Sequence, residues 1–224
     1  TYTRNDVTDR GVGDFSLPSR GYNLLNQQQS LQMTETMVVN TKTINETRFQ
    51  YVRENNQTFG DNSIAALNVL QAFNSGGAQI GTGYNRENHF ELQNYTSIAA
   101  GKHAWKFGLR ARAINLDNLS PSNFGGTFSV AGGPGPQLDA NNQAVLDATG
   151  QPVILPNLSA IERYRRTLLF QQQGLSAALI RTLGGGATQF SRVAGNPLAG
   201  LSQVDLGLFV QDDWRIAPNF TLSL

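Results

Sequence analysis

The sequence predicts an all-β chain of long antiparallel hairpins, and three observations lead to this fold class. Hydrophobic and polar residues alternate with a period of two, as in a strand with two different faces. The alternating segments exceed the ~9 to 11 residues that a tilted strand needs to cross a bilayer. Short and long connections follow one another, as in outer-membrane barrels. We therefore expect an antiparallel transmembrane β-barrel segment, a partial barrel with short helices in its extracellular loops.

The composition excludes several other classes of protein. The 224 residues include 17 Lys and Arg against 16 Asp and Glu, and this balance argues against a nucleic-acid binder. Charged residues make up 15% and the mean hydropathy is −0.31, which fits neither a helical membrane protein nor a disordered tail. The absence of cysteine excludes Cys-based catalysis. The chain begins with Thr1 and has no signal-peptide pattern, so we expect an upstream portion to be missing.

The clearest hairpin surrounds Gly101. Residues 87–99 and 103–117 alternate on either side of a tight turn. One face is apolar and the other carries charged and amide side chains, so we expect a lipid-facing side and a lumen-facing side. The apolar residues include Phe90, Leu92, Trp105, Phe107 and Leu109, and the polar residues include Glu91, Gln93, Lys106, Arg110 and Arg112.

Two further hairpins have the same pattern. Residues 30–39 lead through a turn at Asn40-Thr41-Lys42 into residues 43–54. The third hairpin begins near Ser202, turns at Ala217-Pro218-Asn219 and enters a last strand at Phe220. The chain thus contains about six predicted strands, and we expect its three short turns on the periplasmic side.

The long connections, roughly residues 55–86 and 118–201, are expected to be extracellular. Residues 156–184 predict one helix with a Ser159–Glu162 capping box, and a shorter helix is expected from Asn62 to Asn74. Residues 118–138 are rich in Gly, Pro and Ser and predict an irregular loop. We interpret the arginines of the long helix as a solvated face, with lipopolysaccharide phosphates or a ligand as the alternative; they are Arg163, Arg165, Arg166 and Arg181.

Three segments at the hairpins carry a recognisable pattern. They are Asn45-Glu46-Thr47-Arg48-Phe49-Gln50-Tyr51, Gly101-Lys102-His103-Ala104-Trp105-Lys106-Phe107-Gly108, and Gly207-Leu208-Phe209-Val210-Gln211-Asp212-Asp213-Trp214-Arg215. On these segments the chain resembles the barrel domains of TonB-dependent outer-membrane receptors. The resemblance is to the Oar-like group in particular, which has a carboxypeptidase-regulatory-like N-terminal domain, and it extends over about residues 17–224.

The resemblance implies a barrel of roughly 22 strands that is occluded by a plug and energised through the TonB complex for uptake of a scarce solute. No plug, TonB box or terminal aromatic strand is recognisable in this sequence. About six strands cannot close a wide barrel, since the smallest single-chain barrels use ~8. We therefore expect residues 1–224 to be part of a receptor barrel domain in the outer membrane of a Gram-negative bacterium, without its plug and remaining strands.

The sequence shows no catalytic or metal-binding constellation. His89 and His103 lie on opposite strands of one hairpin without further ligands at metal spacing, so no metal site is predicted. Asp212 and Asp213 are adjacent and point to opposite faces of a strand, which excludes a carboxylate dyad. One is expected to face the lumen and the other to lie near the periplasmic rim. We predict neither enzyme activity nor a cofactor.

The candidate contacts for a solute are Lys106, Arg110 and Arg112, because three cations follow one strand face. The alternative is ordinary lumen packing, with neutralisation by Glu91 and Glu87 on the neighbouring strand. We expect two further residues, Trp105 and Trp214, at the membrane interface, since an indole is apolar in its body and polar at its N–H.

The expected partners are outer-membrane lipid, the TonB complex through the missing plug region, and an unknown small solute. Two other functions share part of the pattern. A passive or adhesive outer-membrane barrel has the same periodicity but no plug. A soluble secreted β-rich binding domain would instead pack the face of Trp105, Phe107 and Leu109 against a second sheet.

Overall fold

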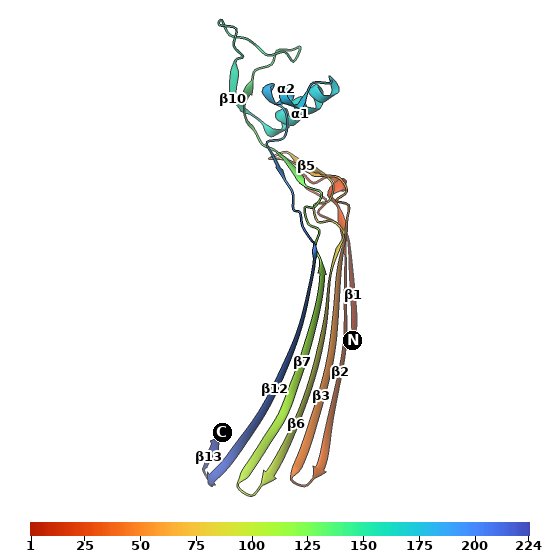
Figure 1. The fold of residues 1–224 in the computed structure, drawn as a ribbon, viewed down its shortest axis with the longest axis vertical. Coiled ribbons are helices and arrows are strands. Elements are labelled where there is room, and N and C mark those ends of the chain that lie inside the picture. The colour runs from red at the N-terminus through yellow and green to blue at the C-terminus, as the bar shows by residue number, and fades with distance from the viewer.

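The computed structural model describes all 224 residues and consists of one long curved sheet with a smaller lobe at one end (Figure 1). Seven antiparallel strands form the sheet in the order of the chain. They are β1 (Tyr2–Arg10), β2 (Tyr22–Asn40), β3 (Thr43–Gly60), β6 (Gly83–Ala100), β7 (His103–Leu119), β12 (Leu198–Ala217) and β13 (Phe220–Ser223). The predicted antiparallel all-β fold is confirmed.

The strands are longer than the alternation predicts. All four segments of the first two predicted hairpins lie inside strands, and each strand continues toward the lobe, to between 17 and 20 residues in the five central strands. The extension of β3 is polar on both faces at Asn55, Asn56 and Gln57, so no alternation marks it. The first strand, β1, was missed for the same reason, and the sheet has seven strands where about six were expected.

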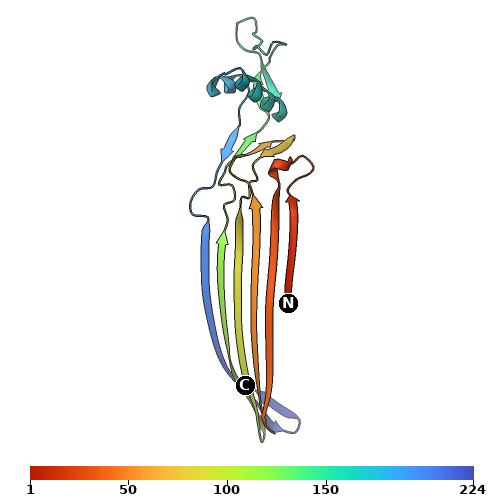
Figure 2. The ribbon, with the colours of Figure 1, turned by 90° about the vertical axis from the view of Figure 1, so that its right-hand side faces the viewer.

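The short and long connections lie at opposite ends of the sheet (Figures 1 and 2). The tight turns at Thr41–Lys42, Gly101–Lys102 and Pro218–Asn219 lie at the end farthest from the lobe. Gly101 has a φ of 64°, a left-handed conformation that glycine adopts without strain. The predicted asymmetry of the connections is confirmed.

The pairing of the central strands continues without a register shift from β3 through β6 and β7 to β12. A single shift by one residue would exchange the two faces of a strand. Because no shift occurs in these pairs, the apolar residues of neighbouring strands lie on the same face of the sheet. The sheet therefore has one continuous apolar face and one continuous polar face.

The sheet is open. β1 pairs only with the part of β2 between Tyr22 and Gln29, and β13 pairs only with the last residues of β12. The remaining outer edges of β2 and β12 have no partner strand, and β1 and β13 do not pair with each other.

The lobe contains a four-stranded sheet in the order β11 (Gln189–Ser191), β8 (Thr127–Val130), β4 (Ala66–Val69) and β5 (Phe73–Gly76). The predicted helix from Asn62 to Asn74 is wrong, because this segment forms β4 and enters β5 through a turn at Gln71 with a φ of 61°. The parallel pairing of β4 with β8 stabilises the strand conformation, and these partners are about 60 residues apart in sequence. Tertiary pairing overrides local helix propensity here.

The predicted irregular loop at residues 118–138 is also wrong in part, since it holds β8 and β9 (Gly133–Pro136). β9 pairs with β10 (Ile154–Leu158), so the predicted helix cannot begin at Pro156. That helix forms two pieces, α1 (Ala160–Gln172) and α2 (Ala177–Thr182), which are separated at Gly174 with a φ of 73°. The Ser159 cap is confirmed, because its Oγ accepts the Glu162 backbone N–H at 3.2 Å.

The buried hydrophobic residues all lie in the lobe, between Ala66 and Ile180. Val69, Val130 and Ala160 form its centre, with Phe73 and Tyr164 packed against them. The long sheet buries no hydrophobic side chain at all. Neither α1 nor α2, nor the single 3-10 turn at Pro18–Arg20, is long and apolar enough to cross a membrane.

Gly108 on β7 tests the register of the sheet. A Cβ at this position would overlap the Asn94 carbonyl oxygen and come within 2.7 Å of the Tyr95 ring. We expect Gly108→Val to reduce the folded fraction strongly, because the β6–β7 pair must separate to admit the side chain. Gly207→Val on β12 is the matched control, since a Cβ there meets nothing within 4 Å.

The folded fraction is measured by the heat-dependent shift of the protein in gel electrophoresis. Equal folding of both variants would contradict the register described here.

Candidate functional site

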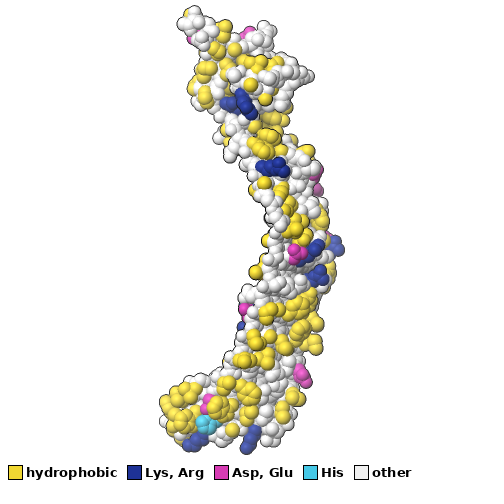
Figure 3. All heavy atoms as spheres, in the orientation of Figure 1, with side chains coloured by type: hydrophobic (Ala, Val, Ile, Leu, Met, Phe, Trp, Pro, Cys, Tyr) yellow, Lys and Arg dark blue, Asp and Glu magenta, His cyan; other side chains and the backbone are white.

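The two faces of the long sheet differ sharply in chemistry. One face carries large hydrophobic side chains from five adjacent strands, most of them exposed: Leu31, Met33, Phe49, Tyr51, Phe90, Leu92, Phe107, Leu109, Val204, Leu206, Leu208 and Val210. Figure 3 shows hydrophobic side chains gathered over the part of the sheet toward the tight turns. No second sheet covers this face. An exposed apolar surface of this extent marks a contact with lipid or another macromolecule.

A small polar network lies within the apolar face. Asn45 on β3 and Asn94 on β6 donate to each other's side-chain oxygen at 3.1 and 3.0 Å. Asn94 also donates to Thr47 Oγ1 at 2.8 Å, and Asn45 donates to Thr96 Oγ1 at 2.8 Å. The amides are thus bonded within the face, which lowers the cost of placing them beside hydrocarbon.

The opposite face carries the three predicted solute contacts, and two of them are paired. Arg110 donates to both carboxylate oxygens of Glu91 at 2.9 and 3.0 Å. Arg112 donates twice to Asp205 Oδ2 on β12, at 3.1 and 2.6 Å. Glu87, expected as the second neutralising residue, instead lies 2.6 Å from His89.

Lys106 has no carboxylate partner. Its Nζ lies 5.1 Å from the centre of the Tyr95 ring, a cation–π contact. Of the three candidate cations, Lys106 therefore has the charge most available to a solute. The paired arginines act mainly as cross-strand links.

Both tryptophans lie on the apolar face near the tight turns. The His103 ring is stacked between them, 5.9 Å from Trp105 and 5.5 Å from Trp214. Asp212, also on this face, binds His103 Nδ1 at 2.7 Å and is buried, while Asp213 points to the polar face. His89 lies on the polar face, so the two histidines do not meet.

Arg166 departs from the predicted solvated face, whereas Arg165 and Arg181 are exposed as predicted. Arg166 is only 3% exposed and donates to Glu162, to the Pro136 carbonyl at 2.7 Å and to the Leu183 carbonyl at 3.1 Å. It thereby ties α1 to β9 and to the end of α2. Arg165 also binds Glu162, at 2.7 and 2.9 Å. These two hydrogen bonds, with that of Arg166, lower the pKa of the Glu162 carboxyl to about 2.

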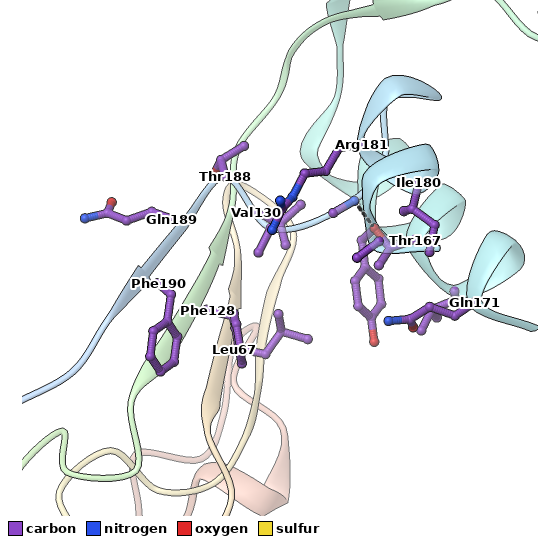
Figure 4. Close-up of a pocket in the computed structure, with 15 residues that line it drawn as sticks. Leu67, Phe128, Val130, Thr167, Gln171, Ile180, Arg181, Thr188, Gln189 and Phe190 are labelled. Atoms are coloured by element: carbon purple, nitrogen blue, oxygen red, sulfur yellow. Dashed lines mark hydrogen bonds between the residues drawn. The ribbon is translucent and has the colours of Figure 1, made fainter. Parts of the chain in front are cut away.

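The lobe contains a cavity of about 720 Å³ between its sheet and its helices (Figure 4). Leu67, Phe128, Val130, Leu168 and Ile180 provide apolar walls, and Phe190 packs on Phe128 with ring centres 4.5 Å apart. In Figure 4 the Arg181 side chain extends from α2 toward Val130 on the opposite wall. Sequence reasoning missed this cavity, because its walls come from β4, β8, β11, α1 and α2.

Comparison with known proteins identifies the class of protein to which the long sheet belongs. A family model described as an outer membrane beta barrel domain matches residues 1–224. The chain belongs to this family. No curated protein and no solved structure matches the chain.

Because the chain belongs to the outer-membrane barrel family, the environment of each face of the sheet can be assigned. The apolar face lies against lipid and the polar face lines the lumen. In such barrels the short turns are periplasmic and the long connections extracellular, so the lobe with its cavity lies outside the cell. The position of Trp105 and Trp214 at the membrane interface stays a prediction.

The assignment of the faces is tested by neighbouring residues on β3. Phe49 belongs to the lipid face and Gln50 to the lumen face at the same depth. We expect Phe49→Arg to destabilise the barrel by on the order of 2 kcal/mol, because a cation on the lipid face is costly, and Gln50→Arg to have little effect. Urea unfolding in lipid vesicles measures both. A larger loss in Gln50→Arg would reverse the faces.

The Glu162 pKa makes the lobe sensitive to acid. An unfolded Glu162 titrates near 4.5 and the folded one at about 2, so its pairing stabilises the lobe fully above pH 4.5 and is lost as the pH falls toward 2. We expect hydrogen exchange of α1 to accelerate over this range, after correction for intrinsic rates and relative to the amides of β7. Glu162→Gln should exchange faster at neutral pH and change less with acid. An identical acid response in both proteins would contradict this role.

Proposed function

We propose that residues 1–224 supply part of the wall and one extracellular lobe of a larger, TonB-dependent receptor barrel that takes up a small solute. Residues 1–224 would have no catalytic role in it. The partners would be outer-membrane lipid, the TonB complex through a plug region, and the solute. The resemblance of the three hairpin segments to Oar-like receptors suggested this function, and the arrangement of the wall supports it.

The open edges of the sheet carry the proposal. On the side of β1, the part of β2 from Leu31 to Val39 crosses the apolar band with an unpaired edge. Backbone N–H and C=O groups at such an edge have no partner in hydrocarbon, so an open edge is not tolerated at that depth. We infer that further strands flank both β2 and β12, which makes the complete barrel wider than seven strands.

The lumen face is consistent with a wide, hydrated interior. Its polar residues are exposed or half-buried, and Arg110 and Arg112 are paired across strands rather than aimed at one point. Such a wall contacts water, a plug or a passing solute without a single tight binding site. A soluble binding domain is a weaker interpretation, since no second sheet covers the apolar face.

Conductance distinguishes a plugged receptor from a passive barrel. We expect the complete protein, inserted into a planar lipid bilayer, to show no steady ion current, because a plug occludes the lumen. Mild urea that unfolds the plug should then open the lumen reversibly and produce an ion current. A steady current without urea would favour a passive barrel.

Co-purification with the periplasmic domain of TonB provides the second measurement, because an adhesive barrel would also be silent in the bilayer. Retention of the complete protein on immobilised TonB domain is expected. A protein that is silent and not retained would contradict the TonB-dependent proposal and favour an adhesin.

A further inference from the structure

The cavity of the lobe has the features of a ligand site that the barrel wall lacks. We propose that it binds a small amphipathic carboxylate, with an apolar body between the helices and the sheet and its carboxylate on Arg181. This goes beyond the proposed transport, since binding of this kind requires neither a plug nor energy.

The apolar side chains of the cavity are exposed and can contact a ligand. Phe128, Leu168 and Phe190 are among its lining residues and remain 41%, 49% and 51% exposed. The buried core of the lobe is formed by Val69, Val130 and Ala160, and these three exposed side chains are not part of it. A bound apolar group would remove them from water, which is favourable in proportion to the area covered.

The charge at the cavity favours an anion. Arg165 and Arg166 bind Glu162, and Arg163 and Arg192 donate to backbone carbonyl groups. The side chain of Arg181 makes no hydrogen bond and no ion pair within the protein. No carboxylate lines the cavity, so its guanidinium has no counter-ion there.

A guanidinium binds a carboxylate through two parallel N–H donors, and this geometry selects a planar anion over a neutral group. Gln171 and Gln189 also line the cavity and make no side-chain hydrogen bond within the protein, so they can bind further polar atoms of the ligand. The volume of about 720 Å³ lies within the range typical of small-molecule sites. These features together describe a small carboxylic acid with an apolar body.

The test uses the complete barrel protein in nanodiscs of uncharged lipid, so that no lipid headgroup supplies an anion. The probes are 2-naphthoate, its neutral analogue 2-naphthalenemethanol, and acetate, and equilibrium dialysis measures binding. We expect saturable binding of naphthoate at one site, binding of the alcohol about tenfold weaker, and no measurable binding of acetate. Absence of saturable naphthoate binding would overturn the proposal.

Variants then assign the two parts of the ligand. Arg181→Gln should remove the preference for naphthoate over the alcohol and leave binding of the alcohol unchanged. Leu168→Gln should weaken both probes. Arg10→Gln is the matched control, because Arg10 ends β1 outside the cavity and makes no side-chain hydrogen bond.

An unchanged preference in Arg181→Gln, or an equal loss in Arg10→Gln, would also overturn the proposal. Hydrogen exchange of α1 and α2 confirms that each variant keeps the lobe folded. The binding test contains neither TonB nor an energy source. Failure of the binding test would therefore leave the conductance and TonB measurements unaffected. Failure of those two measurements would likewise leave the binding test unaffected.

Discussion

The structure of the wall depends on one constraint: backbone groups at membrane depth must be paired across neighbouring strands. The unshifted register from β3 to β12 meets this constraint strand by strand, and it also fixes which side chains face lipid. The sheet has no hydrophobic core of its own, so lipid covers most of its apolar surface. The same constraint explains why an unpaired β2 edge implies further strands.

Lateral pairing also extends to the side chains. On the lipid face, Asn45 and Asn94 bond to each other, and His103 bonds Asp212 between two indoles. On the lumen face, Arg110 binds Glu91 and Arg112 binds Asp205. Each pair joins neighbouring strands, so the polar residues of the wall reinforce the register and leave Lys106 with the least compensated charge among the three predicted contacts.

The hairpins of the wall were predictable because their information is local. A period of two around Gly101 specifies both strands, the turn and both faces within about 30 residues. The lobe was less predictable, because β4 becomes a strand through its pairing with distant β8, and the predicted helix cannot extend back to Pro156 because β10 occupies that segment. The start of α1 after Ser159 was predictable, since its cap is local. For Arg166 the sequence shows a charged helix position, whereas the fold buries it against Pro136 and Leu183.

Wall and lobe are stabilised by different means, and this separation bears on function. The wall relies on backbone pairing and lipid, while the lobe has a small core and the buried Arg166 network. A substitution in the cavity, such as one at Leu168 or Arg181, therefore touches neither the register nor the lipid face. Ligand specificity can change in the lobe without a cost to the barrel. Conversely, Arg110 and Arg112 of the polar wall are paired with Glu91 and Asp205, so a substitution at either arginine would disturb a contact between neighbouring strands.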